Sequence, residues 1–334
     1  KVRYILPYFP NRVRKIDFKF PGMSCFSLHH IASFNFSHKA VKKNEFDIII
    51  ANCQYSSFAA CNIKKYCGIP FLLLVWDPST FTARKIYKRR IGWKYPILYL
   101  CAKLLDKFSL AKCEAVITSG KFHHSYFKKL TNKPLEILVP GCFAKEIFPD
   151  FSKRKRNILT YDRWDIGNDP IIFLDILERL HAKDVNLIVG GFWHPINLSE
   201  KFKYELKRRG LENRVELLGP LDEKMIIDLC STSMVHVHPV HEAFGMQSLE
   251  AAACGCPIII PNGSGVSDLF KHGVHGYFPE DNSVGEFVKY IDMIFNDAKK
   301  SKEMSMRAWE CAKNYTWEGY AQKLVKICRR YIHE

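Results

Sequence analysis

The residues of this sequence that are best placed to bind hydroxyl groups are two glutamates. Glu242 lies in the segment 238–245, and Glu250 lies in the segment 247–254, which is rich in helix-forming residues. Between them, Gly245 lets a ligand approach the backbone closely, because it has no Cβ. A helix that begins just after it directs free N–H groups and a positive dipole end at the loop, which favours phosphate. The pattern therefore suits a phosphate flanked by sugars, as in a nucleotide sugar; alternatively, both glutamates are solvated surface acids.

The elements that must position these residues are two strands and a helix. Residues 234–238 alternate in polarity like a short strand, and residues 258–260 form a β-branched run typical of a buried parallel strand. Gly255 and Pro257 end the helix between them. The stretch is therefore predicted to be a βαβ unit, with the glutamates in its loop and helix.

This stretch resembles the signature of glycosyltransferase family 4, the glycosyl transferases group 1. The family has a proline, then Glu-x-Phe-Gly, then Glu-Ala-x-Ala-x-Gly-x-Pro; here Pro239 precedes EAFG at 242–245 and EAAACGCP at 250–257. The glycine-containing segments 263–266 and 272–277 also match the family. The resemblance implies an α/β protein of the GT-B fold, with two Rossmann-like doubly wound parallel-sheet domains facing a central cleft.

The resemblance also implies roles for the residues of the signature. Glu250 would contact the ribose hydroxyls of the donor, and Glu242, a catalytic candidate, would contact the transferred sugar. The backbone around Phe244, Gly245 and Met246 would cradle the phosphates and the sugar. The family uses a nucleotide-diphosphate sugar as donor substrate, most often a UDP- or GDP-sugar, with no cofactor and no bound metal, and it retains the anomeric configuration.

Four further positions follow from the same resemblance. Arg163 matches the family's diphosphate-binding arginine, which would stabilise the leaving group, and Asn168 stands where the family has a lysine. Leu218 lies near the end of the segment 214–219, and the end of this segment flanks the nucleotide base in the family. Gly22 represents a glycine-rich loop that usually has two glycines, and it could equally be an ordinary turn.

The acceptor side departs from the family at one position. The family commonly has His-Asp after the strand that corresponds to residues 71–75, and this chain has Trp76-Asp77 there. Asp77 could hold an acceptor hydroxyl or assist a proton transfer, or it could cap the turn before Pro78. No other histidine of the first half matches the family's position.

Composition and charge bound the remaining possibilities. The chain has 334 residues, of which 47% are hydrophobic, enough for two ordinary α/β domains, and it has no run of 18 apolar residues. Its 12 cysteines are scattered singly, which indicates reduced thiols and a cytoplasmic protein. The net charge of +16 lies in residues 1–150, with 25 Lys and Arg against 9 Asp and Glu, whereas residues 151–334 hold 25 of each.

The basic half is expected to face an acidic partner, such as a phosphorylated substrate or an anionic membrane surface. Residues 84–95 interleave basic and aromatic side chains before the apolar stretch 97–110. This pattern suits a peripheral contact with the cytoplasmic face of a membrane, or a solvated helix face beside a core helix. No nucleic-acid-binding motif is present, so no nucleic-acid partner is expected.

We therefore predict three segments: an acceptor-binding domain over 1–152, a nucleotide-sugar-binding domain over 153–316, and a helix over 317–334 that packs back on the first domain. The expected function is transfer of a sugar to an anionic saccharide or a lipid-linked acceptor, in glycan or cell-surface polysaccharide biosynthesis. The absent histidine and the Lys-to-Asn change leave open a non-catalytic subunit that binds nucleotide sugar or glycan. A nucleotide-sugar epimerase on the same fold is a third possibility.

Overall fold

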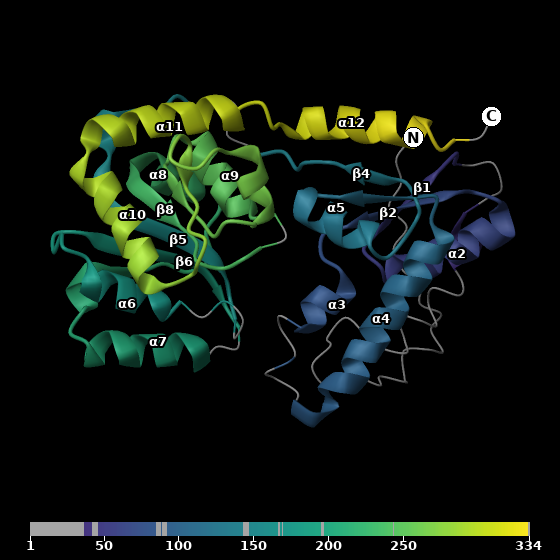
Figure 1. Cartoon of the computed structure of the whole chain (residues 1–334), viewed down its shortest axis with the longest axis horizontal. Coiled ribbons are helices and arrows are strands. Elements are labelled where there is room, and N and C mark those ends of the chain that lie inside the picture. The colour runs from purple at the N-terminus through teal and green to yellow at the C-terminus, as the bar shows by residue number, and fades with distance from the viewer. Residues whose placement is uncertain are drawn as a thin grey trace. The chain divides into compact units, whose positions relative to one another are not determined.

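A computed structural model of the chain describes residues 37–41, 46–84, 88, 92–142, 147–165, 168, 170–194, 197–242 and 244–332. These residues form two compact units, each built on its own sheet (Figure 1). The first unit contains two segments of the chain, one up to Val139 and one from Ala321 onward, and the second unit is Pro140–Tyr320. The predicted loop at Gly22 lies outside the described residues.

The first unit has a parallel sheet in the order β1-β2-β3-β4. Parallel neighbours need crossover connections, and helices supply most of them. Phe71, Leu73 and Val116 on the strands pack with Phe127 on α5 in the core of this unit. The elements are β1 (Ile49–Asn52), α2 (Ser56–Cys67), β2 (Phe71–Val75), α3 (Ser79–Thr82), α4 (Tyr95–Lys112), β3 (Ala115–Thr118), α5 (Lys121–Lys128) and β4 (Leu135–Ile137).

The second unit has a parallel sheet in the order β10-β9-β8-β5-β6-β7. Its strands are β5 (Lys155–Trp164), β6 (Asn186–Trp193), β7 (Val215–Leu217), β8 (Ser233–Val237), β9 (Ile258–Ile259) and β10 (Gly276–Tyr277). Its helices are α6 (Ile172–Arg179), α7 (Asn197–Arg208), α8 (Glu223–Thr232), α9 (Met246–Ala253), α10 (Val284–Asn296) and α11 (Ala298–Ala312). Helices α6, α7 and α10 bury apolar side chains against β5, β6 and β8.

The last helix, α12 (Trp317–Arg329), begins in the second unit and continues into the first. Just beyond its end, the Tyr331 hydroxyl donates to Oε1 of Glu136 at 3.2 Å. Arg330 places a guanidinium nitrogen 2.8 Å from Oε2 of the same carboxylate. These contacts join the C-terminal segment to strand β4.

The basic run 153–156 follows the predicted domain boundary, and Arg154 has a specific structural role there. Its guanidinium donates to the carbonyl oxygens of Cys230 and Ser233, both at 2.5 Å, and to those of Cys254 at 3.1 Å and Gly255 at 2.7 Å. Carbonyls at helix C-termini lack helical partners. One side chain therefore satisfies the ends of both α8 and α9.

The predicted α/β class with doubly wound parallel sheets is confirmed. Strand β5 ends with the polar pair Asp162-Arg163 followed by Trp164. Trp164 is buried, and its indole N–H donates to the Gly190 carbonyl at 2.8 Å. In the part of the chain that the structure describes, every helix is too short or too polar to cross a membrane.

Candidate functional site

The signature stretch folds as the predicted βαβ unit. Strand β8 leads into a loop, Gly245 caps α9, and the chain returns through β9, which pairs with β8. Gly245 has φ of 93°, a left-handed conformation that side chains rarely adopt, and a Cβ there would meet Val266 Cγ1 at 3.2 Å. Gly245 has no side chain that could cap α9, and this end of the helix, with its positive dipole end, suits an anionic ligand.

Glu250 lies on α9 and faces strand β5. Its Oε2 accepts a hydrogen bond from the Tyr161 hydroxyl at 3.1 Å, and that hydroxyl is also 3.1 Å from the Gln247 carbonyl oxygen. Burial raises the pKa of Glu250 to about 7, although the Tyr161 hydrogen bond opposes the rise. A carboxylate that titrates near neutrality is common in ligand-binding sites and rare on open surfaces.

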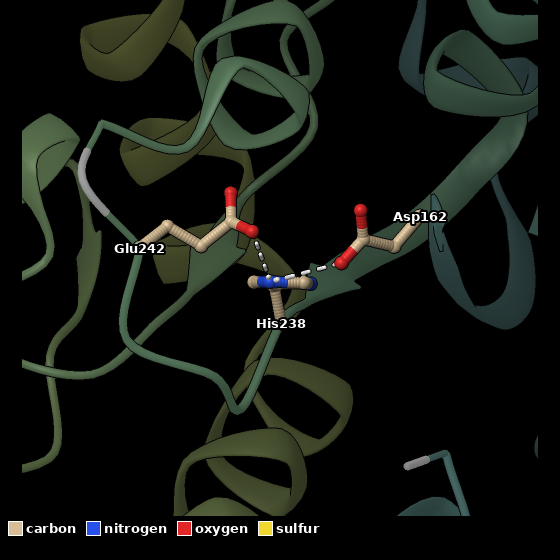
Figure 2. A group of neighbouring side chains, drawn as sticks. All are labelled: Asp162, His238 and Glu242. Atoms are coloured by element: carbon tan, nitrogen blue, oxygen red, sulfur yellow. Dashed lines mark ion pairs between the residues drawn. The ribbon is translucent and has the colours of Figure 1, made fainter. Parts of the chain in front are cut away.

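Glu242 belongs to a cluster of three side chains from β5 and the end of β8 (Figure 2). The Nε2 atom of the buried His238 lies 3.5 Å from Oε1 of Glu242 and 3.7 Å from Oδ2 of Asp162. One ligand atom from each residue lies within 4.8 Å of the others, so the types and spacing are those that a divalent cation can use. Sequence reasoning missed this cluster, because Asp162 is separated from the other two along the chain.

The Asp162 carboxylate is already satisfied by protein donors. Oδ1 accepts from the Gln247 side chain at 2.9 Å and from the Arg163 backbone N–H at 2.7 Å, and Oδ2 accepts from the Asn168 side chain at 2.7 Å. These donors stabilise a negative charge without a metal. We therefore assign no metal to the cluster. The hydrogen bonds of Asp162 form an internal network at the end of β5, and His238 lies at ion-pair distance from both Asp162 and Glu242.

Arg163 and Asn168 both lie at the carboxyl end of β5, where sites in parallel sheets form. The Arg163 side chain is 72% exposed, and its guanidinium is 3.8 Å from the Asp165 carboxylate. The Asn168 amide donates to Asp162. The arginine therefore presents its charge to solvent, whereas the residue in place of the family lysine serves the internal network.

The remaining predicted donor residues occupy the same unit. Phe244 is buried, and its carbonyl accepts from the Val266 N–H at 2.6 Å, which fixes the loop before Gly245. Met246 is the first residue of α9. Leu218 follows β7, and its N–H donates to the Val189 carbonyl at 2.8 Å.

Asp77 lies in the first unit, just after β2. Nε2 of His123, a buried residue of α5, is 3.4 Å from its Oδ1. Burial lowers the pKa of His123 to about 4, so the ring is neutral at pH 7. The sequence comparison excluded His123 because it does not match the family's position; the pairing arises because β2 and β3, which precede the two residues, are neighbours in the sheet.

Another acid caps the short helix α3 that follows Asp77. Asp106, on α4, accepts from the N–H groups of Ser79 at 2.9 Å and Thr80 at 3.1 Å. Asp77 does not need to serve those donors. Its carboxylate, 39% exposed beside His123, remains the candidate for acceptor chemistry.

Comparison with solved structures identifies the fold. Solved structures with a similar fold include sucrose-phosphate synthase from Thermosynechococcus elongatus, with a TM-score of 0.77 and 16% identity over 90% of this chain and 77% of that one. HepE of Anabaena, in complex with UDP and glucose, has a TM-score of 0.73 and 17% identity over 92% of this chain and 83% of that one. The two Rossmann-like units therefore have the GT-B fold.

Residues 145–310 match the model of the glycosyl transferases group 1, and the chain belongs to this family. A curated relative is the GalNAc-alpha-(1->4)-GalNAc-alpha-(1->3)-diNAcBac-PP-undecaprenol alpha-1,4-N-acetyl-D-galactosaminyltransferase of Campylobacter jejuni. It is 22% identical over 311 residues, which cover 90% of this chain and 80% of that protein. Several other curated relatives match this chain over less than half of their own length.

Proposed function

We propose that the protein is a retaining glycosyltransferase that moves a sugar from a nucleotide-diphosphate sugar to a saccharide or lipid-linked acceptor. One observation carries the proposal. Glu242 and Glu250 lie on either side of Gly245, the N-cap of α9, where the absence of a side chain lets a ligand approach the backbone. That arrangement offers carboxylates to hydroxyl groups and N–H groups to phosphate, which are the two chemistries of a nucleotide sugar.

In the proposed complex, Glu250 accepts hydrogen bonds from the ribose hydroxyls and Glu242 from the transferred sugar. The backbone from Phe244 to Met246 binds the phosphates and the sugar, and Leu218 lies beside the base. UDP- and GDP-sugars are the first candidates, and the binding of UDP by HepE supports the former.

The reaction breaks the bond between the sugar's anomeric carbon and the oxygen of the donor's terminal phosphate. The acceptor oxygen forms the new bond on the same face of the sugar, and its proton passes to the departing phosphate oxygen. Negative charge develops on the leaving diphosphate, and the exposed guanidinium of Arg163 stabilises it. We propose that this chemistry needs neither a cofactor nor a metal.

The first unit would bind the acceptor, with Asp77 holding its hydroxyl. The excess of basic residues in 1–150 suits an anionic acceptor, such as a saccharide linked to a lipid diphosphate. The name of the Campylobacter relative, whose acceptor carries PP-undecaprenol, supports this class. The proposal places the protein in glycan or cell-surface polysaccharide biosynthesis, acting at the cytoplasmic face of a membrane.

A thermal-shift series tests the donor site. UDP-, GDP-, ADP- and dTDP-sugars are added to the wild type, to Glu250→Ala and to Glu310→Ala, which removes an exposed glutamate of α11. A donor at 100 times its dissociation constant should stabilise the folded protein by about 2.7 kcal/mol. We expect one donor to stabilise the wild type and the Glu310 variant but not the Glu250 variant; stabilisation that survives Glu250→Ala would contradict the proposed site.

A transfer assay with the donor so identified separates an enzyme from a binding subunit. The side-chain amide of Asn168 donates to Asp162. Because asparagine stands in place of the family's lysine, the region proposed to bind the phosphates has one positive charge fewer than in the family. Donor binding without transfer or hydrolysis would therefore favour a non-catalytic subunit of a glycosyltransferase complex.

A further inference from the structure

Helix α4 exposes a stripe of large apolar side chains. Ile97 is 62% exposed, Leu100 is 56% exposed and Leu104 is 57% exposed, and a spacing of three to four residues places them on one helix face. Trp93, directly before the helix, is 80% exposed. The side of α4 that packs on the protein is formed by Ala102, Leu105, Asp106, Ser109 and Leu110.

The charges around this stripe have one sign. Lys94, Lys103 and Lys107 are exposed. Asp106 is the only acidic residue between 92 and 112, and its buried carboxylate serves the backbone N–H groups of α3. The exposed face of α4 is therefore apolar and cationic, without an anionic side chain.

Two partners could cover such a face, and its charge discriminates between them. A second copy of the chain would meet the stripe through a two-fold axis and would bring lysines near lysines. An anionic lipid surface would instead complement those charges, since lysine side chains reach past buried apolar neighbours to the phosphates. Trp93 suits the boundary between headgroups and acyl chains, where its ring is apolar and its N–H is hydrated.

We propose that the exposed face of α4, defined by Trp93, Ile97, Leu100 and Leu104, docks on an anionic lipid bilayer. The helix lies in the plane of the interface, with the apolar stripe in the headgroup boundary and the lysines at the phosphates. Only the biological role of this docking depends on the proposed function: the docking would bring the first unit to a lipid-linked acceptor.

Co-sedimentation of the full chain with vesicles tests the docking without donor or acceptor. The vesicles contain phosphatidylcholine alone or with 30% phosphatidylglycerol. We expect the wild type to bind the mixed vesicles at least tenfold more tightly, and to lose most of this binding in high salt, because the Debye length falls to about 3 Å at 1 M. The triple variant Ile97→Gln, Leu100→Gln and Leu104→Gln should bind at least tenfold more weakly than the wild type.

A matched variant controls for loss of exposed apolar area in general. Leu130→Gln, Met225→Gln and Val325→Gln replace three side chains that are 49%, 39% and 48% exposed and lie outside α4. This control should bind vesicles like the wild type. Tryptophan emission gives an independent readout: mixed vesicles should shift it to shorter wavelength, and Trp93→Phe should lose that shift.

Three outcomes would overturn the docking. The first is equal vesicle binding by the α4 triple variant and the wild type. The second is equal loss of binding in the control triple variant. The third is a dimer, detected by light scattering, that the α4 variant dissociates while its vesicle binding is unchanged, because the face would then join two copies. Thermal unfolding checks that each variant folds, and an unchanged donor-induced shift separates the docking from the proposed function.

Discussion

The hydroxyl of Tyr161 lies 3.1 Å from Oε2 of Glu250 and joins strand β5 to helix α9. Tyr161 is buried, so this hydrogen bond forms away from bulk solvent. It stabilises the ionised carboxylate, whereas burial and the negative charge of Glu223 favour the protonated form. The balance places the titration of Glu250 near the pH of a cell.

Tyr161→Phe should shift the pH dependence of donor binding. Without the hydroxyl, the pKa of Glu250 rises, so less of the carboxylate is ionised at neutral pH. We expect the donor's dissociation constant to rise roughly tenfold at pH 7 and to approach the wild-type value at pH 9. Titration calorimetry between pH 6 and 9 measures this, with Tyr331→Phe as control, since it removes a similar hydrogen bond to Glu136. A loss that is the same at every pH would mean that Tyr161 only supports the fold.

Glu250→Gln should stabilise the folded protein at high pH while it abolishes donor binding. The pKa of Glu250 is raised, so the folded state keeps a proton that the unfolded chain loses. Wild-type stability therefore falls as the pH rises from about 4.5 to about 7. Glutamine has no charge to bury, so the variant should gain roughly 1 to 3 kcal/mol at pH 8 and little at pH 4.5. Urea unfolding at both pH values, with Glu310→Gln as the exposed control, measures this difference. An equal gain at both pH values would refute the explanation.

Arg163→Ala should lower kcat by roughly 10²- to 10³-fold, because it removes positive charge where the leaving diphosphate becomes negative. Arg163→Lys should retain part of the rate. Arg156→Ala is the matched control, since Arg156 lies on the same strand and pairs with Asp184 at 2.6 Å. Steady-state kinetics with saturating donor separate the two variants, and equal rates would remove Arg163 from the reaction.

Asp77→Asn should lower kcat roughly 10²-fold or more and leave donor affinity unchanged. The residue belongs to the first unit, and the proposed donor residues belong to the second. Asparagine keeps the shape of the side chain and loses its negative charge beside His123. Transfer assays and donor calorimetry on the same preparation check both halves of this expectation; a wild-type kcat would mean that Asp77 takes no part in acceptor chemistry.

Arg154→Ala should destabilise the second unit by roughly 2 to 4 kcal/mol, because four buried carbonyl groups lose a charged donor. Lysine should not restore the loss, because a single ammonium cannot reproduce the planar guanidinium's contacts. Lys153→Ala, at an exposed neighbour, is the control. Denaturant unfolding followed by limited proteolysis would show which unit opens first, and a stable Arg154 variant would contradict the role assigned to this residue.

The sequence was sufficient to predict the βαβ unit around Gly245, since apolar runs and the Gly255 and Pro257 stops are local signals. It was insufficient for the end of strand β5, because the polar pair Asp162-Arg163 gives no local strand signal. The indole of Trp164 holds the strand there by a hydrogen bond to the Gly190 carbonyl, which no local pattern encodes. Pairings between distant segments were equally hidden. His123 lies beside Asp77 because the strands that precede the two residues, β2 and β3, are neighbours in the sheet. The sequence shows that the family histidine is absent, but it does not show that another histidine lies near Asp77.

The return of the chain to its first unit has a consequence for recombination between relatives. The proposed donor residues lie within 140–320, whereas the unit that carries Asp77 and α4 is built from segments on both sides of that block. A single crossover within that block would therefore combine the two segments of the first unit from different parents, with Glu136 and Tyr331 no longer matched. If only the central block is exchanged and both flanking segments come from one parent, donor specificity should change and acceptor specificity should be preserved.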